Sequence, residues 1–508
     1  MKILLNSLLL LPIAVVAGCA NSPSNAVPSS SSQPWQAASD ARGNITLDAA
    51  PPATQSTFVL PSNQALTAMP ISADIDPKHR YTLPELIDLA QSNNPDTRIA
   101  WASAKHAASA IDAVHSTYLP QVSASVIGAL TRSDSSAAAY GLGASNRINA
   151  SGTLASLTLT WLLYDFGKRD AVSEAAQQAA IAANVSFNGT HQRIIYEVSL
   201  AYYRHLAAQH RAKSNAQLVK NAAEVEAAAI DRYKQGIGTV MEKAQARQAS
   251  AQAHFAAVKA DGELRNAEQA LLAIIGISPL STLKVASLPN MPLPKDVPAL
   301  SDAAVMNAVA SRPEVLSAYA AEQAAAAAVK AAQANFKPNI FGAASGTYSD
   351  NDLGLSATPA IGPTTPTFNA SGERSGLVAL IGINIPLYDG AWRSSALRQA
   401  QATAEKASAA LSKIRLEATR QVALAHSEVT SSLAAYDAAQ EMVAASQVNL
   451  DAATAMYRKG IGSVTAATTA ASALLSAENA ASDAYSGAMS ALVSLTFATG
   501  QLSATEAF

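Results

Sequence analysis

The pattern of apolar and polar positions passes through the same series of periods twice along this chain. Each series begins with an Ala-rich helical pattern, changes to strict alternation, and returns to long Ala-rich stretches without proline. A short turn recurs 224 residues later: Tyr233-Lys-Gln-Gly236-Ile237-Gly238 becomes Tyr457-Arg-Lys-Gly460-Ile461-Gly462. A repeat of about 200 residues indicates a duplicated half of one domain rather than a solenoid period.

The first repeat, residues 82–281, is predicted to open with a helix that runs to about residue 118. Thr82 is its expected N-cap and Glu85 completes a capping box, with a break expected before Pro95. A long helix over 166–234 contains no proline, and at 1.5 Å per residue it would span roughly 100 Å. A shorter helix over 240–275 follows the Gly-Ile-Gly turn.

The second repeat, residues 300–500, is predicted to repeat this order. Its elements are a helix over 302–336, a β-hairpin at about 338–388, a long helix over 389–457, the second turn, and a helix over 464–499. In each repeat the two shorter helices together match the long one in length. They could therefore stack end to end as its antiparallel partner. A proline-rich linker, 277–299, joins the repeats, and 501–508 form a tail.

Between the helices of each repeat the apolar period becomes two, which predicts a β-hairpin. In the first hairpin, at about 120–165, Val122, Ala124 and Val126 alternate with polar residues, and Leu157 to Leu163 do so on the return. We expect strands of about ten residues, the length of tilted outer-membrane strands, joined by a polar loop over 131–152. The second repeat is six residues longer between Pro338 and Tyr388, and we place this insertion in its loop.

Aromatic residues gather at the predicted strand ends, as they would at a membrane interface. They are Tyr118, Trp161, Tyr164, Phe166, Phe336, Tyr388 and Trp392. An amphipathic hairpin of a soluble protein would look similar strand by strand. The aromatic belt and the N-terminal signal favour the membrane interpretation.

The first long helix carries a stripe at coiled-coil spacing with small side chains. Its members are Ile194, Val198, Ala201, His205, Ala208 and Ala212, and their counterparts are Ala418, Val422, Ala425, Val429, Ser432 and Tyr436. The stripe predicts close helix packing, although a solvated stalk would also accommodate it.

The N-terminus has the pattern of a secretory signal. A basic start and an apolar run lead to Ala17-Gly18-Cys19, so residues 1–18 are the predicted signal peptide. Cys19 is the single cysteine, which leaves no partner for an intramolecular disulfide. Its setting also resembles the bacterial lipobox, in which the cysteine is acylated, for example with palmitate. An ordinary signal peptide with an incidental cysteine is the alternative. Residues 19–81 are then expected to be a flexible tether without periodic structure.

Composition argues against several functional classes. The chain has 35 basic and 37 acidic residues, and this balance does not suggest a nucleic-acid surface. The eight histidines include no His-Glu-x-x-His pair, and Asp350-Asn351-Asp352 lacks the rest of a Ca²⁺ loop pattern. We therefore expect no enzyme activity, no metal site and no cofactor.

Four membrane strands cannot close into a barrel, and an open sheet edge in lipid leaves backbone groups unpaired. Several copies of the chain must therefore share one barrel. The chain must therefore form an oligomer, and the number of copies is left open by the sequence.

The chain resembles the TolC family of outer-membrane efflux proteins over residues 82–500. The matching features are the strand–helix junctions, the two turns, and the helix starts Asn94-Pro95 and Arg312-Pro313. The junction residues are Tyr164, Asp165 and Gly167 in the first repeat and Tyr388, Asp389 and Gly390 in the second.

The resemblance implies a mainly α fold in which three copies share one β-barrel and one periplasmic α-barrel. It also implies an outer-membrane location in a Gram-negative bacterium, and the lipobox resembles the lipid-anchored, drug-efflux branch. The two turns would be periplasmic tips that contact an adaptor protein serving an inner-membrane pump. Some relatives carry an acidic ring after the second tip, whereas residues 463–476 contain no acid here. The resemblance therefore does not extend to a block of the periplasmic channel entrance by cations.

Two functions follow from these observations. The first is a passive exit duct of a tripartite efflux or type I secretion system, exporting small molecules or polypeptides. The second is a structural coiled-coil lipoprotein that spans the periplasm without a pore.

Overall fold

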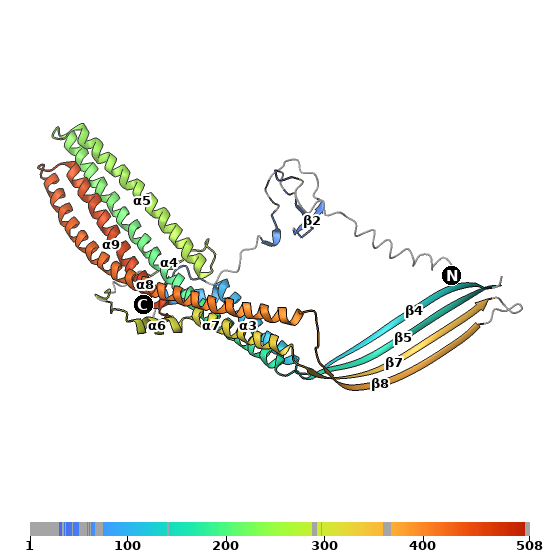
Figure 1. Cartoon of the computed structure of the whole chain (residues 1–508). Coiled ribbons are helices and arrows are strands. Elements are labelled where there is room, and N and C mark those ends of the chain that lie inside the picture. The colour runs from blue at the N-terminus through green and yellow to red at the C-terminus, as the bar shows by residue number, and fades with distance from the viewer. Residues whose placement is uncertain are drawn as a thin grey trace. The chain divides into compact units, whose positions relative to one another are not determined.

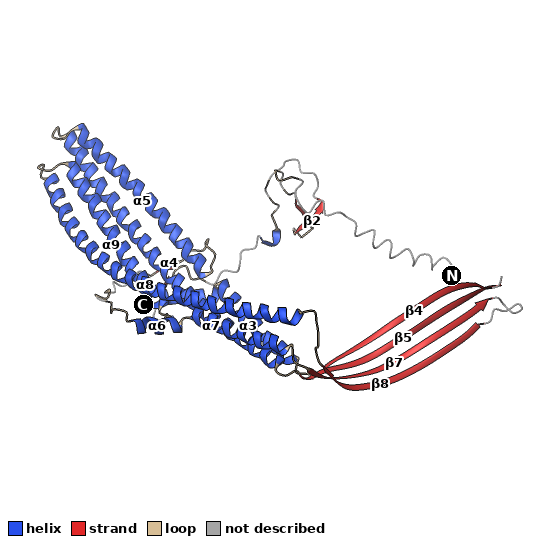
Figure 2. Ribbon diagram, in the orientation of Figure 1, coloured by secondary structure: helices blue, strands red, loops and turns tan. Residues whose placement is uncertain are grey.

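The computed structural model describes residues 75–139, 142–286, 292–295, 297–358 and 367–502, together with short pieces between 30 and 66. The chain divides into two units, Met1–Ile75 and Asp76–Phe508. The second unit holds both repeats, and its four long strands form one sheet separate from the helices (Figure 2).

The first unit contains more structure than the sequence predicts. Strand β1 (Ala37–Ser39) pairs antiparallel with β2 (Ile45–Ala49), and η2 (Gln64–Leu66) is a short 3₁₀ helix. The carboxylate of Asp40 accepts hydrogen bonds from the backbone N–H groups of Arg42 and Asn44, each at 2.8 Å, and so forms the turn. Local turn chemistry thus folds a hairpin that has no long apolar period, and the flexible tether over 19–81 stays a prediction.

The second unit begins with a short strand that ties the chain to the inter-repeat linker. Strand β3 (Arg80–Tyr81) pairs in parallel with β6 (Lys284–Val285), and Tyr81 is buried. The backbone N–H of Thr82 then donates to the Glu85 carboxylate at 2.7 Å, which begins the first helix at the expected position.

The elements of the two repeats follow the predicted order. The first repeat contains α2 (Leu83–Asn93), α3 (Pro95–Ser116), β4 (Gln121–Ala139), β5 (Leu142–Tyr164), α4 (Lys168–Lys234) and α5 (Val240–Ile275). The second contains α6 (Asp302–Ser311), α7 (Pro313–Ala334), β7 (Asn339–Thr358), β8 (Thr367–Asn384), α8 (Trp392–Arg458) and α9 (Val464–Ala498). The prolines at 95 and 313 start new helices, because the residue before proline is forced out of the helical conformation.

The helices pack as the length argument suggested (Figure 1). Helix α4 contacts both α3 and α5, and α8 contacts both α7 and α9. The end of α5 meets the α2–α3 corner, where the Asn94 side-chain amide donates to the Ile274 carbonyl at 2.8 Å. A Cβ on Gly276 would lie 2.7 Å from the Cα of Asn94, so only glycine allows this approach.

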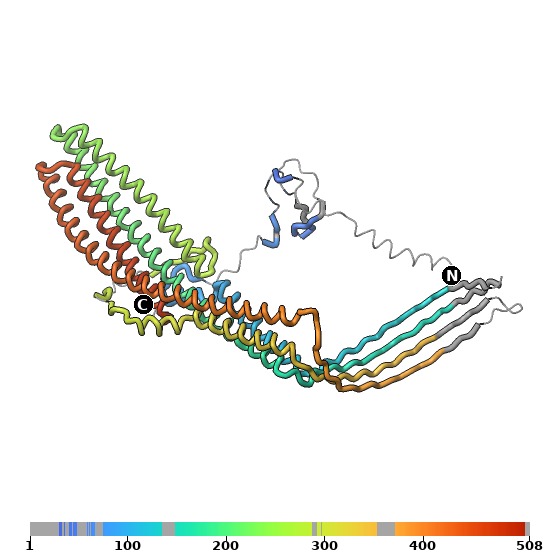
Figure 3. Tube along the Cα trace, in the orientation of Figure 1, coloured from blue at the N-terminus to red at the C-terminus, as the bar shows by residue number. Residues whose placement is uncertain are grey.

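The two repeats lie side by side along their helices (Figure 3). Helix α4 also contacts α7 and α9, and this contact joins the repeats. The coiled-coil stripe on α4 is confirmed, since all six of its residues are buried. On α8 the first four counterparts are buried, whereas Ser432 and Tyr436 are half-buried and Leu433 is buried instead.

The two hairpins form a single antiparallel sheet in the order β4-β5-β7-β8. The strands contain 18 to 23 residues, so the expectation of about ten residues and of a loop over 131–152 was wrong. The pairing of β4 and β5 continues from Gln121↔Thr160 to Ala139↔Leu142. The half of each strand that is farther from the helices has polar residues on both faces. It was missed because alternation of apolar and polar residues identifies only strands with one apolar face.

At the opposite end of the sheet, β8 is shorter than the alternation predicted. It ends at Asn384, so Ile385 and Leu387 lie outside the strand. Pro386 stands between them and cannot donate to a strand ladder. The connections between strands are residues 140–141 in the first hairpin and 359–366 in the second, and both lie outside the described residues. The second is six residues longer, which equals the predicted insertion.

Within the described residues, no helix combines the length and apolar character needed to cross a membrane.

Candidate functional sites at the strand–helix junctions and the tip turns

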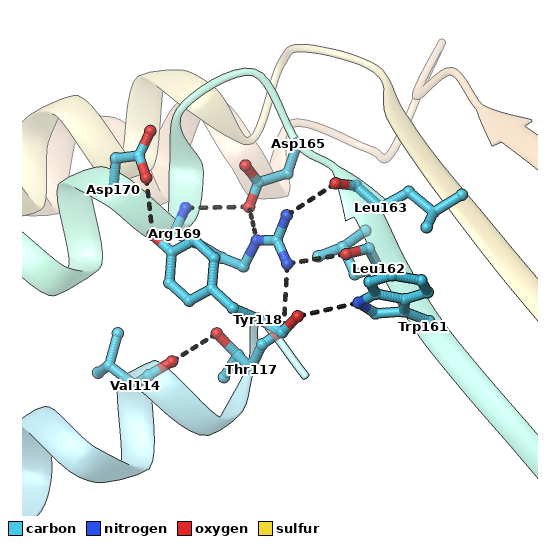
Figure 4. A network of polar contacts seen from close by, with 9 residues as sticks. All are labelled: Val114, Thr117, Tyr118, Trp161, Leu162, Leu163, Asp165, Arg169 and Asp170. Atoms are coloured by element: carbon cyan, nitrogen blue, oxygen red, sulfur yellow. Dashed lines mark hydrogen bonds and ion pairs between the residues drawn. The ribbon is translucent and has the colours of Figure 1, made fainter. Parts of the chain in front are cut away.

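A buried ion pair between two residues one helical turn apart organises the first junction. The Arg169 Nε lies 3.1 Å from the Asp165 carboxylate, which also accepts the backbone N–H of Arg169 at 2.9 Å (Figure 4). Asp165 therefore caps the start of α4, where a carboxylate is favoured by the free N–H groups. Both side chains are about nine-tenths buried, at 8% and 10% exposed.

The rest of the Arg169 guanidinium connects three elements. It donates to the carbonyls of Thr117 at 3.1 Å, Leu162 at 2.8 Å and Leu163 at 3.2 Å. The planar fork of arginine supplies five donors in fixed directions, so one side chain can satisfy the end of α3 and the end of β5 together. Arg169 thus fixes the direction in which the sheet leaves the helices.

Aromatic side chains complete this junction (Figure 4). The Tyr118 hydroxyl donates to Asp170 at 2.7 Å, and the Trp161 indole donates to the Tyr118 carbonyl at 2.9 Å. The Arg169 guanidinium lies 4.6 Å from the centre of the Tyr118 ring. Desolvation, and then the hydrogen bond to Asp170, raise the pKa of Tyr118 to about 12, so this hydroxyl stays a donor at neutral pH.

The second junction has the same ion pair with fewer contacts. The Arg393 Nε lies 2.6 Å from the Asp389 carboxylate, and the hydrogen bond from Arg393 lowers the pKa of Asp389. Asp389 is 29% exposed, and Arg393 lies 5.9 Å from the Phe336 ring. In the described part of the chain the hydrogen bonds of Arg393 go to Asp389 alone.

Both junctions contain two consecutive residues in the left-handed region. They are Phe166 at φ 55° and Gly167 at φ 92°, and Gly390 at φ 66° and Ala391 at φ 72°. The repeats therefore place their single glycine at different positions of the pair. A Cβ would meet nothing within 4 Å at either glycine, so these glycines serve backbone conformation rather than close packing.

The structure brings the six predicted junction residues to the two strand–helix boundaries. Tyr164 is half exposed, with its ring centre 4.7 Å from that of Phe166, and Tyr388 is almost fully exposed. Sequence reasoning missed Arg169 and Arg393. The signal was present, because Asp and Arg recur four residues apart in both repeats at the offset of 224.

Each tip turn ends its helix with a Schellman motif. The N–H of Ile237 donates to the Arg232 carbonyl at 3.1 Å and that of Gly236 to Tyr233 at 3.1 Å, with Gly236 at φ 77°. The second tip repeats this with Ile461 to Met456 at 3.1 Å and Gly460 at φ 78°. The next helices start at Thr239 and Ser463, whose hydroxyls each accept an N–H at 3.1 Å.

Four glycines in two such turns predict that the chain reverses with positive φ at each of them. This prediction is wrong for Gly238 and Gly462, since only Gly236 and Gly460 have positive φ. At Gly238 a Cβ would lie 2.9 Å from the backbone N of Tyr233, and at Gly462 it would lie 3.0 Å from that of Tyr457. The second glycine of each tip is thus required by close approach to the preceding helix.

The two tip tyrosines lie in different environments. Tyr233 is 42% exposed, and Lys243 lies 5.3 Å from its ring. Tyr457 is only 3% exposed and lies 5.5 Å from the Arg232 guanidinium. It packs in a cluster that joins the two helical hairpins, with Ala229, Ala246, Val464 and Ala467. Tyr457 therefore holds the tips together, while Tyr233, Ile237 and Ile461 face outward.

The remaining candidate residues add no catalytic site. Cys19 lies outside the described residues. Asp350 and Asp352 belong to β7 rather than to a loop, and no group of three metal-ligating side chains occurs among the described residues. His205 is buried on α4, and burial lowers its pKa.

Comparisons with known proteins match this architecture. A model of the family described as Outer membrane efflux protein matches residues 86–277 and 304–501. CyaE of Bordetella pertussis is 25% identical over 383 residues, covering 75% of this chain and 76% of CyaE. The outer membrane protein TolC of Escherichia coli is 25% identical over 394 residues, covering 75% and 74%.

Solved structures share the fold. CusC matches with a TM-score of 0.67 and 21% identity, covering 82% of this chain and 92% of that one. VceC of Vibrio cholerae matches with a TM-score of 0.65 and 19% identity, covering 82% and 96%. The predicted fold class, mainly α with a small β part, is confirmed.

The difference between the junctions predicts unequal effects of one substitution. Asp165→Asn leaves the buried Arg169 charge uncompensated, and we expect it to lower the free energy of unfolding by about 3–5 kcal/mol. Asp389→Asn, at the more exposed site, should shift the unfolding temperature much less. Thermal unfolding of both variants in detergent, followed by circular dichroism, measures this difference. Equal shifts would show that Arg169 does not depend on its carboxylate.

Proposed function

The chain belongs to the outer membrane efflux protein family, and from this premise we propose that it is a passive exit duct across the outer membrane and periplasm. In this proposal the chain is a homotrimer in the outer membrane of a Gram-negative bacterium. The four strands of each copy contribute to one barrel, and the helices to one periplasmic tunnel. The family's members are channels rather than enzymes, and we propose no reaction for this chain.

One observation carries the proposal: the sheet has an apolar face and two unpaired edges. The register places Val122 opposite Leu159 and Leu157 opposite Gly346, which in turn faces Leu377. Leu377, Ile381 and Val126 on this face are exposed. Ser123, Thr158 and Ser345 lie opposite one another on the other face. The first face thus suits lipid, whereas the second is mixed, because Val378 continues the row of Ser123, Thr158 and Ser345.

The unpaired edges support an oligomer, and three copies are consistent with them. Among the described strands, β4 and β8 each pair on one side only. Unpaired backbone groups in hydrocarbon cost several kcal/mol each, so further strands are needed on both edges. Three copies would supply twelve strands, above the minimum of about eight for a spanning barrel.

A lipid anchor at Cys19 is the second part of the proposal. The sequence around Cys19 supports it, and acylation would add to a barrel that already holds the protein in the membrane. Mass spectrometry of the mature N-terminus should find an acylated Cys19. An unmodified terminus that begins at another residue would disprove the anchor.

The duct is distinguished from a pore-free coiled-coil lipoprotein by conductance. We expect the purified full-length protein to have the mass of three chains in detergent and to produce discrete current steps in planar bilayers. A stalk would bind membranes through its lipid but conduct no current. Trimers without conductance would therefore favour the structural alternative.

The tips are the proposed contact with a periplasmic adaptor that serves an inner-membrane pump. The exposed residues Ile237 and Ile461, at 64% and 76% exposed, support this assignment, whereas Tyr457 acts from the interior. A Cβ on Gly236 would meet nothing within 4 Å, so the backbone at this position is open to a partner.

We expect Ile461→Ser to lower efflux several-fold while the number of trimers in the outer membrane is unchanged, because the side chain has few contacts in its own chain. Ile461→Leu, which keeps the apolar area, is the matched control. Efflux and trimer abundance are measured in the same cells. A fall in efflux that only follows a fall in abundance would reject the docking role.

A further inference from the structure

The strand register divides the side chains of the sheet between two faces, because directly paired residues of antiparallel strands point to the same side. The face that suits lipid, which we call the lipid face, carries Val122, Leu157 and Leu377. The opposite face, which we call the lumen face, carries Ser123, Thr158 and Ser345. The pairing of β4 with β5 and of β7 with β8 has no register shift, so each face continues along the strands.

The charged residues of the sheet are divided unequally between these faces. The strand segments 121–134, 148–164, 339–352 and 371–384 contain six charged residues. Five of them lie on the lipid face, and they are Arg132, Asp134, Asp350, Asp352 and Glu373. The sixth, Arg374, lies on the lumen face, because it pairs with Ser349, four residues beyond Ser345 on the same strand. In these segments Arg374 is therefore the one charged residue that faces the lumen.

Aromatic residues indicate the depth at which Arg374 lies. On β7, Ile340 pairs with Tyr164, and Tyr348 lies eight residues further along the strand. Eight residues of an antiparallel strand span roughly 27 Å, close to the apolar band of about 25 Å in outer-membrane barrels. The charged residues of the lipid face all lie beyond the row of Tyr348. Arg374 lies at the same boundary on the opposite face, since its partner Ser349 follows Tyr348.

No charge on the lumen face of the described segments compensates Arg374. Its neighbours on this face of β8 are Gly372 and Gly376, and Ser349 opposite it is uncharged. The Arg374 side chain is exposed, and it forms no ion pair with a described residue. An arginine stays charged throughout the physiological pH range. Its positive charge therefore acts on whatever passes along this face.

We propose that Arg374 sets the charge preference of the exit, so that anionic solutes pass more readily than cationic ones. Three copies would place three guanidinium groups in a ring on an otherwise uncharged stretch of the lumen face, and rings of arginine or lysine favour anions in pores. This inference rests on the proposed trimeric duct and adds to it the class of solute. The charges act over about 10 Å at 0.1 M salt, so the preference is graded rather than absolute.

Reversal potentials of the full-length protein in planar bilayers under a KCl gradient test this preference. At about 0.1 M salt, wild-type channels should favour chloride over potassium. Arg374→Ser should lower the chloride-to-potassium permeability ratio about two- to fourfold, whereas Arg374→Lys should preserve it. At about 1 M salt, where charges act over only about 3 Å, the wild type and the serine variant should agree.

The adjacent residue supplies a matched control on the opposite face. Glu373→Gln removes a charge beside Arg374 in the sequence, and we expect no change of selectivity. Cysteine variants test the two orientations, because Cys19 is the single natural cysteine. A water-soluble, negatively charged thiol reagent added to open channels should lower the chloride preference of Arg374→Cys and leave Glu373→Cys unchanged. The reagent acts on assembled channels, so this result does not depend on how the variants fold.

The outcomes separate this inference from the proposed function. Conducting Arg374→Ser channels that keep the wild-type chloride preference would overturn the role of Arg374 and leave the duct intact. Equal effects of the reagent at positions 373 and 374 would overturn it as well. A wild-type chain that conducts no current would overturn both proposals.

Discussion

The need to satisfy backbone hydrogen bonds at the two open edges of one sheet governs this molecule. Strands β4 and β8 have partners on one side only among the described strands. The sheet also carries an apolar face in the half that is nearer to the helices. In water this face would aggregate, and in lipid the edges would be costly. The proposed barrel, shared between several copies, would meet both requirements, and the proposed helical tunnel would extend the same closure beyond the membrane.

The junctions explain how the long helices connect to the strands of the sheet. At each one an aspartate begins the long helix and holds an arginine four residues later. Two left-handed residues in succession turn the chain between strand and helix, at a cost of roughly 1–2 kcal/mol for each residue that is not glycine. Phe166 and Ala391 are the two residues that carry this cost. In the first repeat the hydrogen bonds of the buried Arg169 offset it. The second repeat has fewer such bonds and stands beside the free edge strand, where a neighbouring copy would approach.

The sequence predicted the parts of the fold in which the local structure follows from a single repeated pattern of residues. The duplicated turn, proline positions and coiled-coil stripe placed the helices, because small residues at regular spacing leave few alternatives. The strand lengths were wrong, since β4 and β5 continue through Thr131 and Gly152, where both faces are polar. Tyr457 could not be distinguished from Tyr233 by sequence, because its burial depends on Arg232 and on the other hairpin. The roles of Arg169 and Arg393 also depend on contacts between elements. Their repeated spacing from Asp165 and Asp389 could nevertheless have revealed them.

The pairing of β5 with β7 has a consequence for the order of folding. It joins residues as distant as Ser145 and Thr358, whereas each hairpin pairs residues that are close along the chain. Closing such a long loop is slow unless other contacts have already shortened it. The α4–α7 contact would do this, because it joins the helix that follows β5 to the helix that precedes β7. We therefore expect the helical rods to form in the aqueous compartment first, with the lipid-facing surface completed last and exposed to water for the shortest time.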